Sequence, residues 1–153
     1  MKSVPHPIVH LATHGQFSSE ADDTFILTWN DKLKVNELSG VLKSAELSRD
    51  GTLELLVLSA CETAAGDTRS ALGLAGVAVR SGARSTVATL WRVNDEASAT
   101  LMGQFYDQLA QLSKTGISKA EALRRAQLAI LQSPDYGQDP YYWAAYVLIG
   151  NWI

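Results

Sequence analysis

The stretch LELLVLSA, at residues 53–60, is the best candidate for a buried strand in this sequence. Two other short, mostly apolar runs have the same character: IVHLAT at residues 8–13 and RSTVATLW at residues 84–91. Between the strands at 53–60 and 84–91, residues 72–81 carry small and apolar residues with helical spacing. Parallel strands need a crossover of about this length. The pattern therefore predicts an α/β fold with a mostly parallel sheet flanked by helices.

The remaining segments predict elements that surround this sheet. After a polar loop at residues 16–23, FILTW and KLKV flank Asn30-Asp31 and indicate a hairpin with a tight turn. The segment WAAYVLIG, at residues 143–150, is expected to form the last strand. Capping residues mark the ends of four expected helices: Asn36 at the start of a helix ending near Leu47, Gly82 at the end of the crossover helix, Asp95 at the start of a third helix, and Ser118 with Glu121 as the capping box of a fourth.

Length, composition and charge exclude several classes of protein. A chain of 153 residues that is 46% hydrophobic can bury a core, and we expect one domain over residues 1–153. The net charge is −3 and no basic stripe is visible, which argues against nucleic-acid binding. No apolar run approaches the roughly 18 residues of a membrane span, and the N-terminus does not resemble a signal peptide. These features predict a cytoplasmic protein with no membrane partner.

The lone cysteine, Cys61, excludes an internal disulfide and a thiolate metal cluster. His14 and Cys61 each follow a predicted buried strand directly, so parallel pairing would bring both side chains to one edge of the sheet. A cysteine and a histidine placed there form a nucleophile and its proton acceptor. Gly15 permits close backbone approach, and the amides of Gly15 and Cys61 then form an oxyanion hole. The competing interpretation is that Cys61 is a small buried hydrophobe.

The histidines at positions 6, 10 and 14 are spaced by four, which on a helix would suggest a metal site. Pro5, Pro7 and the apolar run indicate a strand instead, so we expect neither a metal nor another cofactor. Within that strand, His10 is interpreted as a hydrogen-bonded core histidine.

Several motifs together resemble one known family. They are ATHG around His14, LSACETAAGD around Cys61, and then ATLWRVND, FYDQL, ALRRAQ and WAAYVLIG. In this order they resemble the CHAT domain, a caspase-like peptidase family often attached to tetratricopeptide repeats. The resemblance implies a caspase-like fold, a His14–Cys61 catalytic dyad and a regulatory repeat domain in the parent protein. Because the family's domain normally carries two more strands before the histidine strand, we expect this chain to be its C-terminal portion.

Resemblance to caspases also implies candidate substrate-binding residues. Trp91 and Arg92 fall where those enzymes place a tryptophan wall and an arginine that binds aspartate. Asp95 would instead receive a basic side chain, as in arginine- and lysine-specific relatives, and Ser59 replaces the acid that metacaspase-like enzymes carry two residues before the cysteine. The specificity stays open between these alternatives.

The leading functional hypothesis is a cysteine endopeptidase that acts on a protein or peptide substrate without a cofactor. Two alternatives remain: a non-catalytic pseudo-peptidase or truncated interaction module, and a thiol-dependent enzyme acting on small molecules.

Overall fold

A four-stranded, mostly parallel sheet forms the centre of the computed structural model. Its strands are β1 (Ile8–Ala12), β5 (Leu55–Ser59), β7 (Ser85–Thr89) and β8 (Tyr146–Gly150), in the order β1-β5-β7-β8. The first three strands run parallel to one another, as their apolar runs predicted. Strand β8 runs antiparallel to β7. The structure describes residues 8–17, 23–48, 53–59, 62–63, 76, 78–79, 82–111 and 116–153.

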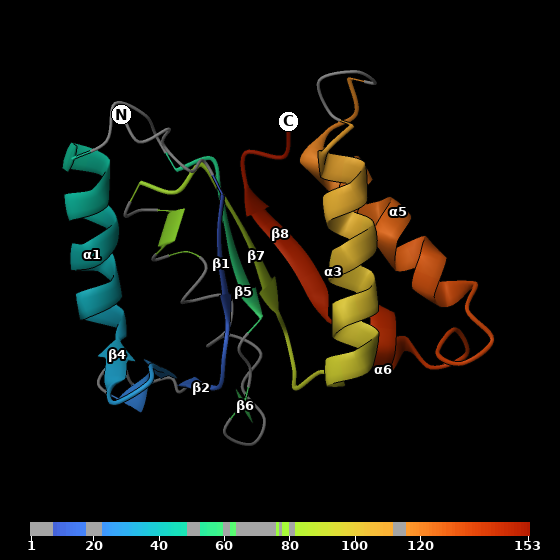
Figure 1. Ribbon diagram of the computed structural model, residues 1–153, viewed down its shortest axis with the longest axis horizontal. Helices are drawn as coiled ribbons and strands as arrows, with labels where there is room; N and C mark the ends of the chain where they lie inside the picture. The colour runs from blue at the N-terminus through green and yellow to red at the C-terminus, as the bar shows by residue number, and fades with distance from the viewer. Residues whose placement is uncertain are drawn as a thin grey trace.

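Helices cover both faces of this sheet (Figure 1). Helix α1 (Val35–Ser48) lies on one face, and α3 (Asp95–Leu109) and α5 (Lys119–Leu131) lie on the other. Successive side chains of a strand point to opposite faces, so β5 supplies both cores. Towards α1, its side chains pack with Leu38 and Leu42; towards α3 and α5, they pack with Phe105 and other buried residues. Coverage on both faces explains why every residue of β7 is buried and why β5 reads as a continuous apolar run.

A second, smaller sheet lies next to the carboxyl end of β1 (Figure 1). It contains β2 (Gly15–Phe17), β3 (Phe25–Leu27), β4 (Lys32–Lys34) and β6 (Glu62–Thr63), in the order β4-β3-β2-β6. The predicted hairpin is confirmed, but its loop spans residues 28–31 and closes through bonds between Thr28 and Asp31. The prediction of a loop from residue 16 is wrong at its start, because Gln16 pairs with both Phe25 and Glu62.

Two of the predicted helix starts differ from the structure: α3 begins one residue earlier than expected and α1 two residues earlier. Asn94, and not Asp95, caps α3: its side chain accepts from the amide of Ala97 at 2.9 Å. Helix α1 begins at Val35, so Asn36 lies inside it. The predicted cap of α5 is confirmed, since Ser118 accepts from the amide of Glu121, although the Glu121 carboxylate binds arginines instead of completing a capping box.

The crossover helix at 72–81 lies mostly outside the described residues. Gly76, Ala78 and Val79 are helical, and Gly82 has a φ of 107°, a conformation that glycine adopts readily at the end of a helix. The predicted last strand begins later than expected, because α6 (Pro140–Trp143) occupies the segment before β8 and is capped by Asp139. None of the helices in the described ranges has both the length and the apolar composition needed to traverse a bilayer.

Candidate active site

The carboxyl ends of the parallel strands meet at one edge of the central sheet. In the β1–β5 pair the last partners are Ala12 and Ser59, so His14 follows two residues after this pair. Beyond it the two chain segments pair again, in parallel, through Gln16 and Glu62. His14 is exposed, and its carbonyl accepts from the amide of Leu27 at 2.7 Å. The histidine therefore lies between two paired stretches that fix its backbone on both sides.

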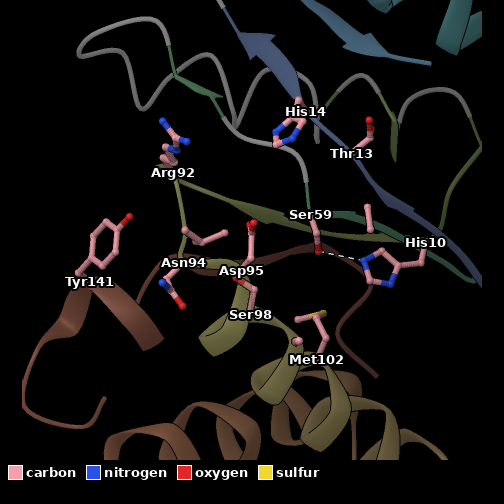
Figure 2. A pocket seen from close by; sticks show the side chains of 13 residues that line it. His10, Thr13, His14, Ser59, Arg92, Asn94, Asp95, Ser98, Met102 and Tyr141 are labelled. Atoms are coloured by element: carbon pink, nitrogen blue, oxygen red, sulfur yellow. Dashed lines mark hydrogen bonds between the residues drawn. The ribbon is translucent and has the colours of Figure 1, made fainter. Parts of the chain in front are cut away.

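A cleft of about 710 Å³ opens at this edge (Figure 2). Four parts of the chain form it: β1 with the residues after it, the end of β5, the segment from Arg92 into α3, and Tyr141 of α6. In Figure 2, His14 lies on the side opposite the α3 residues Asp95, Ser98 and Met102. The lining residues are His10, Ala12, Thr13, His14, Ser59, Arg92, Val93, Asn94, Asp95, Ser98, Ala99, Met102 and Tyr141.

Most of the residues that the sequence predicted as catalytic or substrate-binding line the cleft. His14, Ser59, Arg92 and Asp95 all line it. Trp91 is not among its lining residues: its indole N–H donates to the backbone carbonyl of Tyr141 at 3.1 Å, and its ring packs against the core beside α3 and α5. Trp91 thus holds a residue that lines the cleft, and it does not form the cleft wall itself.

The two residues predicted to form the oxyanion hole are Gly15 and Cys61, and the structure describes only the first. Gly15 is buried and pairs with Ile26 in the second sheet. Cys61 lies outside the described residues, so the His14–Cys61 dyad and the oxyanion hole remain predictions. The nearest described residues along the chain are Ser59, which lines the cleft, and Glu62, which belongs to β6.

His10 is hydrogen-bonded, as expected, but it is not a core histidine, because it is exposed and lines the cleft. Its Nε2 is 2.9 Å from the hydroxyl of Ser59, and its Nδ1 is 2.9 Å from the hydroxyl of Tyr106 on α3. Partial burial lowers the pKa of His10 and raises the pKa of Tyr106. The imidazole is therefore neutral and the phenol protonated at neutral pH.

Of the α3 residues that line the cleft, the sequence predicted Asp95 but not Ser98 or Met102. Asp95, Ser98 and Met102 lie three or four residues apart, the spacing that places side chains on one face of a helix. The hydroxyl of Ser98 is buried and has no hydrogen-bond partner among the described residues. This periodicity was visible in the sequence, but only the docking of α3 beside β7 shows that the face meets the cleft.

No group of three or more histidine, cysteine or carboxylate side chains in the described part of the chain is arranged to hold a metal ion. The polar groups of the cleft are two imidazoles, hydroxyls, a carboxamide, a carboxylate and a guanidinium. Such groups bind and orient a polar organic substrate and transfer protons to and from it.

Comparison with known proteins gives one assignment. The family profile described as CHAT domain matches residues 2–151, which is nearly the whole chain. No curated protein matches the sequence at a significant level.

Proposed function

The chain belongs to the CHAT domain family, which is related to caspase-like cysteine peptidases, and we propose that it is a cysteine endopeptidase that uses Cys61 and His14. One observation carries the proposal: His14 lines a cleft at the carboxyl edge of the parallel sheet, next to the end of the strand that precedes the chain's one cysteine. In open α/β sheets, ligands bind at this edge, beyond the carboxyl ends of the strands.

The strand pairing around His14 supports the dyad. Ser59 pairs with Ala12 before the histidine, and Glu62 pairs with Gln16 after it. The two described residues that flank Cys61 in sequence therefore pair with the two sides of the segment that carries His14. This arrangement favours an approach of thiol and imidazole over an interpretation of the cysteine as core filler.

The proposed reaction has two half-steps. His14 takes the proton of the Cys61 thiol, the thiolate adds to the peptide carbonyl carbon, and the C–N bond breaks as His14 protonates the leaving amine. Water then attacks the thioester while His14 accepts its proton, releasing the carboxylic acid and restoring the thiol. The amides of Gly15 and Cys61 are proposed to stabilise the oxyanion in both steps. This hydrolysis needs no cofactor.

Substrate recognition is proposed to fall to the polar side chains of the cleft. Arg92 suits an acidic side chain before the scissile bond and Asp95 suits a basic one, and Ser59 lines the same cleft. Trp91 contributes through its bond to Tyr141. We further propose that a tetratricopeptide-repeat domain of the parent protein regulates the site, as in related proteins of the family.

The dyad is tested by the reactivity of the single thiol. Because an imidazole partner keeps a cysteine ionised below its ordinary pKa, Cys61 should react with iodoacetamide at pH about 6 at least tenfold faster than a free thiol. His14→Ala should remove this advantage. His10→Gln distinguishes the two histidines of the cleft, because the proposal requires the loss in His14→Ala and not in His10→Gln.

Alkylation at the rate of a free thiol in the unmodified chain would overturn the dyad. That result would favour the non-catalytic interaction module. A reactive Cys61 that cleaves no member of a peptide library would instead favour a thiol-dependent enzyme of small molecules.

A further inference from the structure

A chain of hydrogen bonds joins two residues that line the cleft, His10 and Ser59, to Tyr106. The three residues belong to three different elements. The Tyr106 hydroxyl on α3 bonds to Nδ1 of His10 on β1, and Nε2 of His10 bonds to the Ser59 hydroxyl on β5, each at 2.9 Å. The rings of His10 and Tyr106 also contact each other, with centroids 5.7 Å apart. Figure 2 shows the bond between His10 and Ser59, on the side of the lining residues away from Tyr141.

This chain holds the oxygen of the Ser59 hydroxyl in place. A neutral imidazole has one donor and one acceptor nitrogen, so it gives one of these bonds and accepts the other. In one tautomer His10 donates to Ser59, and the Ser59 proton is left to point elsewhere. In the other tautomer Ser59 donates to His10, and the lone pairs of Ser59 are left to accept. In both cases the bond to His10 holds the Ser59 oxygen in place, and in the second tautomer it also fixes the direction of the hydroxyl proton.

The location of these groups argues for a role in binding. Both His10 and Ser59 line the cleft, and neither is fully buried. A hydrogen bond between partly exposed groups adds little to folding stability, since water satisfies the same groups in the unfolded chain. A hydroxyl that is already oriented, in contrast, loses less entropy when a ligand binds to it.

We propose that His10 and Tyr106 are positioning residues that orient the Ser59 hydroxyl to hydrogen-bond a polar side chain of the peptide substrate. This inference rests on the proposed peptidase function and adds to it a requirement for a polar residue in the cleft. Ser59 makes the contact with the substrate, and the two aromatic residues act through it.

The test compares four peptides that differ only in the residue before the scissile bond: norleucine, lysine, glutamine and glutamate. The chain should cleave one of the polar peptides with a higher kcat/KM than the norleucine peptide. Ser59→Ala should lower this preference about tenfold, the value of one hydrogen bond, mainly through KM. Tyr106→Phe keeps the packed ring and removes only the oxygen, and it should lower the preference in the same direction.

A double variant decides whether Tyr106 acts through Ser59. In the Ser59→Ala background, Tyr106→Phe should cause no further loss of preference, because no hydroxyl remains to be oriented. For the imidazole, His10→Gln, which retains a donor and an acceptor, should keep more of the preference than His10→Leu. A purely structural role predicts equal losses on all four peptides.

Three results would overturn the inference: no polar peptide preferred over norleucine, additive effects of Ser59→Ala and Tyr106→Phe, or no cleavage of any of the four peptides. Iodoacetamide reactivity of Cys61, measured on the same variants, separates this failure from a failure of the peptidase proposal. If the positioning role alone is wrong, the thiol remains reactive. If the dyad is wrong, the thiol reacts slowly in the unmodified chain as well.

Discussion

Lys119 is the most deeply buried cation in the described part of the structure, with 4% of the residue exposed. Its ammonium donates to the Glu54 carboxylate at 2.7 Å and to the backbone carbonyl of Ile153. Glu54 also binds the more exposed Arg84 at 3.2 Å. Although burial raises the pKa of Glu54, the hydrogen bond and charge of Lys119, with those of Arg84, outweigh it and hold that pKa below its ordinary value. The Glu54 carboxylate thus links the residue before β5 to α5 through Lys119, and the Lys119 ammonium also binds the carbonyl of Ile153.

Lys119→Met keeps the length of the side chain and removes its charge. We expect it to lower the free energy of unfolding by about 2 kcal/mol, because Glu54 loses its closest cation and a backbone carbonyl loses its donor. Arg84→Met removes the other cation of the same carboxylate and should cost under about 1 kcal/mol, as exposed ion pairs do. Urea unfolding curves of the two variants check the difference, and equal losses would contradict the dominant role assigned to Lys119.

At the scale of single residues, the sequence predicted the site only in part. His14 could be nominated because it follows an apolar strand, and its position at the strand end is confirmed. The expected hydrogen bonding of His10 is confirmed, but its expected place in the core is wrong. Its partners could not be predicted, because they are 49 and 96 residues away along the chain. Only the register of β1 on β5 and the docking of α3 bring the three groups together.

The secondary-structure elements followed from the sequence better than their ends did. Apolar runs predicted β1, β5 and β7, and β5 and β7 carry such residues because they are covered on both faces. Strand β1 was expected to be buried as well, but its residues alternate between exposed and half-buried. The start of α3 was wrong by one residue because Asn94 and Asp95 are both favourable caps, and the pattern alone does not choose between them. Because Asn94 is the cap, the carboxylate of Asp95 is not needed for capping, and Asp95 lines the cleft.

Asn94→Ala tests this cap. It should lower the free energy of unfolding by about 1 kcal/mol, because the amide of Ala97 loses its acceptor at the start of α3. Asp95→Ala should cost less, about 0.5 kcal/mol, since it removes only the favourable interaction of a carboxylate with the helix dipole. Thermal unfolding of both variants compares the two effects. A larger loss in Asp95→Ala would restore Asp95 as the cap.

At the scale of the whole molecule, the sheet is enclosed unevenly. Strands β5 and β7 each have a neighbour on both sides and helices on both faces, whereas β1 pairs with β5 alone among the described residues. Its residues alternate between exposed and half-buried, unlike the fully buried β7. The strand that carries His10 and leads into His14 is therefore the least enclosed of the parallel strands.

Native-state hydrogen exchange measures this difference. Amides of β5 and β7 should exchange slowest, with protection approaching that of global unfolding, because opening them disrupts both cores. The outward-facing amides of β1 should exchange at least about tenfold faster, since no strand among the described residues supplies hydrogen-bond acceptors on that side. The amides of β8, which forms the opposite edge of the sheet, serve as an internal comparison. Protection of β1 equal to that of β5 would contradict this view, because it would require another segment or another chain to cover the outer edge beside the histidines. Such a cover would also place the partner within reach of the cleft, where it could alter the position of His10 and through it the Ser59 hydroxyl.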